Sequence, residues 1–307
     1  MTAPRASSNA SRILLVFAFL SVYLIWGSTY LAIRFAVESI PPLLMAGGRF
    51  LFAGAILYAW RLSRGAARPT AAQWKAAAIS GTLMLLGGNG IVCWAEQWVL
   101  SGLTALIISS VPIWMGVMHW AIEPAKRPGV RGIAGLLIGF AGVAILVHPG
   151  AHFGGGNQVQ VGALLLVLAS AFWAAGSLYS RRAGAPPDPM LSTSIQMLAG
   201  GAALTVAGAA MGEIGRVRFD AITARAAWSF LYLIVFGSIV AFTAYTWLLK
   251  VTTPAKAATY AYVNPIVAVI LGAVIADEPI SGLTLVAAAI IVGSVVVITT
   301  ERPRQST

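Results

Sequence analysis

The chain has 307 residues, of which 59% are hydrophobic and only 9% are charged, whereas a soluble domain has about 25% charged residues. This composition excludes a water-soluble fold for most of the chain. The net charge of +11 does not indicate a nucleic-acid partner, because the basic residues are scattered between apolar runs and do not gather on one surface. Cys93 is the single cysteine, so the chain can form neither an internal disulfide framework nor a cysteine-based metal site.

Ten apolar stretches follow one another along the chain. They fall at about 13–33, 42–60, 76–97, 102–121, 130–147, 161–180, 190–210, 228–249, 256–276 and 281–299. A helix that crosses the hydrocarbon layer needs about 20 mainly apolar residues. The sequence therefore predicts an all-α integral membrane protein of ten transmembrane helices in the lipid bilayer, with short tails at 1–12 and 300–307. The loops leave no room for a soluble catalytic domain.

The basic residues predict the orientation of these helices. With the N-terminus inside, cytoplasmic segments carry 15 of the 20 Lys and Arg residues and the opposite side carries 4, namely Arg34, Arg216, Arg218 and Arg225. Basic loops resist translocation. We therefore expect a multi-pass protein of the bacterial inner membrane with both termini in the cytoplasm.

The chain also contains an internal repeat. An offset of 147 pairs Trp26 with Trp173, Pro42 with Pro189, Leu51 with Leu198 and Gly54 with Gly201, and an offset of 153 pairs Trp94 with Trp247 and Pro112 with Pro265. The two halves, 13–147 and 161–299, each hold five predicted helices. Because five is odd, the second half must be inverted in the membrane relative to the first. Inverted repeats are typical of secondary transporters.

The order of short motifs resembles the EamA-type ten-helix branch of the drug/metabolite transporter superfamily. The motifs are Trp26-Gly27-Ser28, Ala32-Ile33-Arg34, Pro41-Pro42, Arg49-Phe50, Glu123-Pro124 and Glu278-Pro279. The run from Gly88-Asn89-Gly90 to Ala95-Glu96 is similar to YedA-like and PecM-like members. The resemblance implies export of small metabolites or toxic compounds through a central cavity lined by helices 1, 3, 4, 6, 8 and 9.

The third predicted helix carries the clearest candidate polar face. Asn89, Cys93, Glu96 and Gln97 are spaced by three to four residues, which places them on roughly one face of a helix. We expect Asn89, Glu96 and Gln97 to line the transport pathway, and a carboxyl group in a cavity of low dielectric can exchange protons as a coupling ion. The alternative is that Glu96 lies at the interface and reaches periplasmic water.

Arg49 lies about two turns into the second helix, and its repeat partner is Gln196. An intramembrane arginine either caps free backbone carbonyls or contacts substrate, and we favour the structural role for Arg49. Pro112 and Pro265 each remove a backbone hydrogen bond from a helix. A kink at either proline would widen a cavity or act as a gate.

Aromatic residues of the eighth and ninth helices are the remaining candidates for substrate binding. Tyr245 and Trp247 lie on the eighth, and Tyr260 and Asn264 precede Pro265 on the ninth. Together with Trp26 and Trp94 they would form a box that stacks planar or cationic substrates. The alternative, a belt at the bilayer surface, fits Trp94 and Trp247 as well as a box does, but fits Trp26 less well.

Other classes of protein fit the sequence less well. The chain has no His-Glu-x-x-His metal helix and no phosphate-binding loop, so an intramembrane enzyme and a primary pump are disfavoured, and no cofactor or metal is expected. A passive facilitator remains as an alternative to an exporter. The expected substrates are amino acids, nucleobase-like compounds or organic cations, and the glycine face of the fifth helix fits a monomer or a homodimer.

Overall fold

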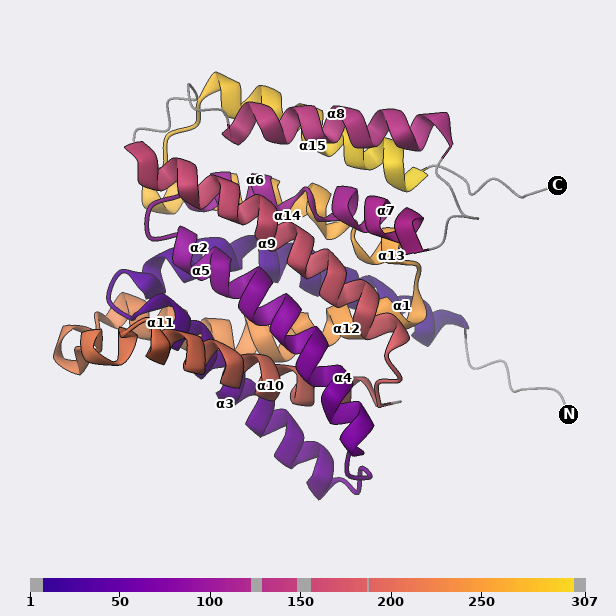
Figure 1. Cartoon of the computed structure of the whole chain (residues 1–307), viewed down its shortest axis with the longest axis vertical. Helices are drawn as coiled ribbons and strands as arrows, with labels where there is room; N and C mark the ends of the chain where they lie inside the picture. The colour runs from indigo at the N-terminus through magenta and orange to yellow at the C-terminus, as the bar shows by residue number, and fades with distance from the viewer. Residues whose placement is uncertain (1–7, 123–128, 148–155, 187, 301–307) are drawn as a thin grey trace, which may run out of the picture.

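The computed structural model describes residues 8–122, 129–147, 156–186 and 188–300, and these residues form helices and short connections without a β-strand (Figure 1). Seven continuous helical segments are long and apolar enough to cross a membrane. They are Arg12–Val37, Pro42–Ser63, Ala71–Ala95, Ser101–Ile122, Gly156–Arg182, Pro189–Ala210 and Ala224–Val251. The apolar helices α8 (Val130–Val147), α14 (Tyr260–Ala276) and α15 (Gly282–Thr300) complete the ten. The predicted fold class is thus confirmed.

The individual helices within these segments are shorter than the spans. They are α1 (Ser8–Leu20), α2 (Trp26–Val37), α3 (Pro42–Ser63), α4 (Ala71–Gly81), α5 (Ile91–Ala95), α6 (Ser101–Ile108), α7 (Val111–Ile122), α9 (Gly156–Arg182), α10 (Pro189–Ala210), α11 (Ala224–Tyr232), α12 (Thr243–Val251) and α13 (Pro254–Ala257). The first, third and eighth spans each join two α-helices through a π-helical segment. These segments are η1 (Ser21–Ile25), η2 (Thr82–Gly90) and η6 (Leu233–Phe242).

The π-helical segments were not predicted, because hydropathy responds to side chains and not to the backbone hydrogen-bond register. Adding the repeat offset of 153 to residues 82–90 gives 235–243, so η2 and η6 lie at matching places in the two halves. Short π-helical turns are frequently found at functional sites. Their position therefore directs attention to the middle of the third and eighth spans.

A pseudo-two-fold axis between the halves is visible in the packing of α3 against α10. A Cβ atom added at Gly54 would lie 3.0 Å from the backbone nitrogen of Leu198, and one added at Gly201 would lie 3.0 Å from that of Leu51. The repeat pairs Gly54 with Gly201 and Leu51 with Leu198. The same contact is thus made twice with the partners exchanged, as a two-fold relation requires.

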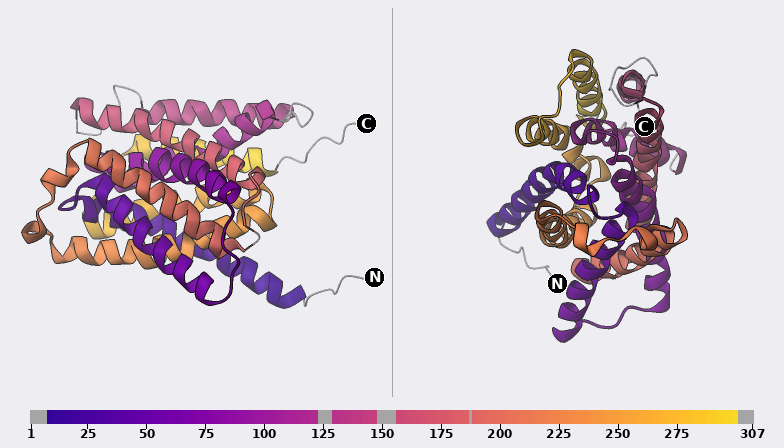
Figure 2. Two further views of the ribbon diagram at one scale, coloured as in Figure 1. Left: turned by 60° about the horizontal axis from the view of Figure 1, so that its bottom comes forward. Right: turned by 90° about the vertical axis from the view of Figure 1, so that its left-hand side faces the viewer.

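The helices run roughly parallel in one bundle, with α8 and α15 side by side at one edge (Figures 1 and 2). Gly142 of α8 lies directly against Ile291 of α15, so a small residue permits this close packing. Large apolar side chains on the outside of the bundle, such as Val274, Val206 and Leu137, are exposed. This surface suits lipid and not water.

The two ends of the bundle are held by different polar contacts. At one end, called here the Glu278 end, the Glu278 carboxylate accepts hydrogen bonds from Arg34 Nη1 at 2.9 Å, Ser101 Oγ at 2.8 Å and the backbone nitrogens of Ser101 and Gly102 at 3.0 and 3.1 Å. At the other, the Asp188 end, Asp188 pairs with Arg61, and Lys250 Nζ donates to the Pro186 carbonyl at 2.6 Å. Helix α1 begins at the Asp188 end, and helix α15 ends there (Figure 1).

The start of α3 is capped by a residue distant in sequence. In the second half, Asp188 caps α10 by accepting from the backbone nitrogens of Met190 and Leu191. The matching residue of the first half is Pro41, whose side chain cannot accept a hydrogen bond. Glu213 takes over this function and accepts from the nitrogens of Leu43 and Leu44 at 3.2 and 2.9 Å.

Replacing Glu213 with alanine should destabilise the fold by about 1–3 kcal/mol, because two buried or half-buried backbone donors lose a charged acceptor. The measurement is thermal unfolding in detergent, followed with a thiol-specific dye, since the single cysteine Cys93 is buried. Asp220→Ala is the matched control: Asp220 lies in the same loop but is exposed, and its ion pair is with the equally exposed Arg218, so its melting curve should not shift. Equal shifts for the two variants would contradict the capping role.

Candidate substrate cavity

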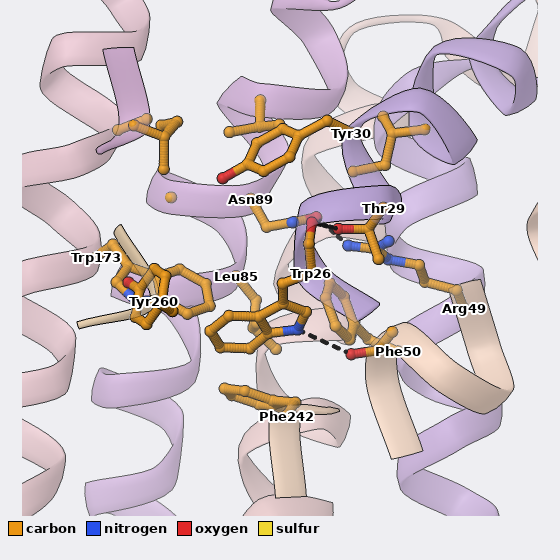
Figure 3. Close-up of a pocket in the computed structure, with 16 residues that line it drawn as sticks. Trp26, Thr29, Tyr30, Arg49, Phe50, Leu85, Asn89, Trp173, Phe242 and Tyr260 are labelled. Atoms are coloured by element: carbon orange, nitrogen blue, oxygen red, sulfur yellow. Dashed lines mark hydrogen bonds between the residues drawn. The ribbon is translucent and has the colours of Figure 1, made fainter. Parts of the chain in front are cut away.

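A cavity lies in the middle of the bundle between the two halves (Figure 3). Its lining comes from both halves of the chain and includes side chains of α2, α3, η2, α6, α9, η6 and α14. The cavity encloses about 60 Å³, which is room for a few water molecules. Two of the helical segments that line it are the matched π-helical segments η2 and η6.

Trp26 occupies the centre of an aromatic cluster that forms one wall of this cavity. Its ring centroid lies 5.4 Å from that of Trp173 at an interplanar angle of 85°, 4.9 Å from Tyr245 and 5.3 Å from Tyr260. Its indole nitrogen donates to the carbonyl of Gly237 in η6 at 3.1 Å (Figure 3). Trp26 and Trp173 are repeat partners, so their contact places the cavity on the pseudo-two-fold axis.

Arg49 brings the only charge to the cavity among its described lining residues. Its side chain is 3% exposed, and Nη2 donates to Asn89 Oδ1, which also accepts from Cys93 Sγ at 3.4 Å. The guanidinium lies over the Phe50 ring, 4.4 Å from its centroid. Its Nε has no hydrogen-bond partner, and no carboxylate of the described residues lies within 4 Å of the group.

Glu96 follows the end of α5, beyond the cavity lining and toward the Glu278 end. It is only 2% exposed, so in this conformation the carboxyl group does not reach the surface. Neither carboxyl oxygen has a hydrogen-bond partner. Burying a carboxylate without hydrogen-bond donors costs free energy. The contacts of the described residues do not explain why an acid is present at this position.

The structure separates the other candidates on the third span. Asn89 lines the cavity, but Trp94 lies on the opposite face of the helix, in an apolar groove with Leu43 and Phe172. Gln97 is exposed, and its amide donates to the Trp94 carbonyl at 2.9 Å. The predicted polar face therefore diverges beyond Cys93, because α5 ends at Ala95 and the turn that follows ends the regular three-to-four spacing.

The candidates on the eighth and ninth spans fall into two groups. Tyr260 lines the cavity, and Tyr245 is buried behind Trp26 with its hydroxyl 2.8 Å from Ser177 Oγ. Trp247 is half-buried and lies outside the lining. Asn264 is buried, and its amide, oriented to donate, reaches the carbonyls of Tyr23 at 2.9 Å and Tyr260 at 3.2 Å.

The repeat-matched gating candidates occupy different surroundings. Pro112 is the second residue of α7, directly after a break in the fourth span at Ser109–Ser110, whereas Pro265 lies inside α14. Gln196 lies away from the cavity, with its amide 3.2 Å from Ser180 Oγ and 3.3 Å from Ser192 Oγ. Arg49 and Gln196 thus match in sequence but differ in environment.

Sequence reasoning missed several residues of the lining. They are Thr29, Tyr30, Ile33, Phe50, Leu85, Gly88, Val92, Ile108, Ala169, Trp173, Gly237 and Phe242. Trp173 carried a signal, because it is the repeat partner of Trp26, and Phe50 lies next to Arg49. The apolar members carried none, since apolar residues cover every face of these helices.

Substrate sites of many membrane transporters lie at the interface between two repeats, and this cavity is lined by both halves of the chain. The sequence profile of the EamA-like transporter family matches residues 13–148 and 160–300. The chain belongs to this family and is a multi-pass inner-membrane transporter, not an enzyme.

Relatives of known name agree with this assignment. The chain is 40% identical over 286 residues to the inner membrane transporter YedA of Escherichia coli K12, covering 92% of this chain and 89% of the relative. It is 26% identical to the transporter YvbV of Bacillus subtilis 168, covering 96% and 94%. A solved crystal structure that is 22% identical has a TM-score of 0.65 and covers 95% of this chain and 96% of its own, which supports the fold.

Trp26→Phe should lower the stability of the protein by about 1 kcal/mol, because phenylalanine keeps an aromatic ring but loses the hydrogen bond to the Gly237 carbonyl. Thermal unfolding in detergent measures this loss. Trp228→Phe serves as the control, since Trp228 is 71% exposed on the outside of the bundle and its replacement should leave the melting curve unchanged. A Trp26→Phe variant as stable as the wild type would show that this bond does not hold α2 against η6.

Proposed function

We propose that this protein is a secondary transporter that exports small metabolites or toxic compounds from the cytoplasm by alternating access. The observation that carries the proposal is the position of the cavity, on the pseudo-two-fold axis and lined by both halves. In transporters built from inverted repeats, one half rocks against the other around a site at their interface. The contact between Trp26 and Trp173 lies at such an interface.

The small size of the cavity supports a mechanism in which the two halves move apart to admit substrate. Ligand pockets of proteins usually measure about 300–1,000 Å³, and this cavity encloses about 60 Å³. The halves must therefore move apart at one end before a metabolite can enter. The contacts of Glu278 with Arg34 and Ser101 would have to change when the Glu278 end opens, and those of Asp188 and Lys250 when the Asp188 end opens.

The distribution of basic residues indicates which end of the bundle faces the cytoplasm. The Asp188 end carries the loop with Arg64 and Arg68 and the ends of helices with Arg181, Arg182 and Lys250. We place this end in the cytoplasm on the positive-inside rule, and both termini with it. The Glu278 end then faces the periplasm.

Counterflow in proteoliposomes tests the carrier mechanism against a passive channel. Vesicles are loaded with millimolar unlabelled L-phenylalanine, uracil or tetraphenylphosphonium and diluted into the same compound, labelled, at micromolar concentration. A carrier that alternates access gives a transient accumulation of label with at least one compound of its substrate class, whereas a channel only equilibrates. The control is protein-free vesicles. Equilibration without accumulation for a compound that the protein does pass would favour the facilitator.

The orientation of the protein in the cell membrane is measured with a cysteine variant. Cys93→Ser removes the single cysteine, and Gly215→Cys places one in the loop between α10 and α11, where an added side chain meets no atom within 4 Å. In intact cells a membrane-impermeant maleimide should label this cysteine, because we place the loop in the periplasm. Labelling only after permeabilisation would invert the proposed topology.

Glu96 is the proposed site of proton coupling, because it is a buried carboxyl group without a hydrogen-bond partner that lies between the cavity and the Glu278 end. A Glu96→Gln variant should still exchange substrate in counterflow, yet lose the stimulation of net transport by an imposed pH gradient. Glu38→Gln is the control, since Glu38 lies at the same end but is partly exposed and paired with Arg225. A Glu96→Gln variant that keeps the full response to the gradient would exclude the coupling role.

A further inference from the structure

One buried nitrogen donor on the cavity lining, Arg49 Nε, has no acceptor. Trp173 Nε1 also makes no hydrogen bond of regular geometry, although the hydroxyls of Tyr245 and Tyr260 lie close to it. The other unpartnered polar atoms of the described residues belong to side chains outside the lining. A buried donor without an acceptor is destabilising, so the cavity is complementary to a ligand that accepts hydrogen bonds.

The positive charge of Arg49 also has no ion-pair partner among the described residues. A guanidinium has five N–H donors and always carries its charge, and Arg49 uses Nη2 on the neutral amide of Asn89. Arg34, the next basic residue toward the Glu278 end, is already paired with Glu278. Glu96 is close enough for a Coulombic interaction with Arg49, but it forms no ion pair with the guanidinium and does not line the cavity. Among the described residues, the charge of Arg49 therefore has no ion-pair partner in the cavity lining, which disfavours a cationic ligand.

The walls around Arg49 are aromatic. Phe50 lies against the guanidinium, and Trp26, Trp173, Phe242 and Tyr260 border the remaining space (Figure 3). Aromatic walls favour flat apolar groups, which stack or pack edge to face on them. A carboxylate matches a guanidinium in a bidentate arrangement.

We propose, on the basis of the transport function proposed above, that the substrate is an organic acid with a planar apolar group. Its carboxylate binds Arg49 and its flat part packs against the cluster of Trp26 and Trp173. Of the substrate classes that the sequence indicated, this choice excludes organic cations. It also supplies a driving force, because the inside-negative membrane potential drives an anion out of the cytoplasm.

Three compounds that are similar in shape but differ in charge test the proposal. They are the anion 3-phenylpropanoate, the neutral 3-phenylpropanamide and the cation 3-phenylpropylamine. Binding to the purified full-length protein is measured by thermal stabilisation, since a ligand that prefers the folded state raises the melting temperature. The carboxylate should bind wild type about tenfold more tightly than the amide, and the amine should give no shift. Hexanoate, which lacks the ring, should bind more weakly than 3-phenylpropanoate. An amide or amine that stabilises as well as the carboxylate overturns the proposal without any variant.

Two variants test whether Arg49 is the residue that binds the carboxylate. Arg49→Gln removes the charge, and Asn89→Asp places a carboxylate beside the guanidinium within the protein. Both should abolish the selective shift with 3-phenylpropanoate, and Asn89→Asp should fold because it pairs a buried charge. Arg225→Gln, which changes an exposed arginine paired with Glu38, should keep the shift. If Asn89→Asp binds the carboxylate as wild type does, Arg49 is not the anchor.

Flux measurements separate this proposal from the proposed function. Proteoliposomes loaded with each of the three compounds are given a potassium diffusion potential, negative inside. Selective binding of the carboxylate without any flux would contradict transport but support the assignment of the site. Flux of the amine without the carboxylate would support transport and overturn the assignment. Carboxylate efflux that the potential accelerates supports both.

Discussion

The structure depends on one constraint: within hydrocarbon, each backbone N–H and C=O group must find its partner inside the protein. Helices satisfy this over most of the chain, but their first turns leave free donors. Here carboxylates accept from several of these donors. Asp188 does so locally for α10, Glu213 for α3 and Glu278 for α6. Because Glu213 and Glu278 come from the second half and cap helices of the first, the same bonds that complete the helices also join the two halves.

The two halves share one architecture but not one chemistry. Gly54 and Gly201 make equivalent contacts, and the π-helical segments η2 and η6 lie at equivalent places. Arg49 and Gln196 break this equivalence, since Arg49 faces the cavity with its charge and Gln196 bonds to serines elsewhere. A symmetric frame allows two alternative openings around one site. A single charged residue placed off the symmetry gives that site a preference for one sign of ligand.

The buried polar groups near the centre of the bundle differ from those at its two ends. Arg49 lies in the low-dielectric centre with an amide as its partner, and Glu96 lies toward the Glu278 end without a partner. Each of these groups is costly to bury in its charged form, and each is the residue on which one of the two proposals above rests. The ends of the bundle are instead held by fully partnered groups, such as Glu278.

The amino-acid sequence predicted ten membrane spans, which the all-helical structure confirms. It also predicted an inverted relation of the halves and named Trp26, Asn89 and Tyr260, which line the cavity. These follow from hydropathy, from an odd number of helices per repeat and from the cost of polar groups in a membrane, all of which are local or additive properties. Three further features emerge only from the folded structure: Trp26 contacts Trp173, Trp94 faces an apolar groove, and Glu213 caps α3 from 170 residues away in the chain. These depend on π-helical register and on contacts between distant segments. A helix that is apolar on every side carries no signal for which face it buries.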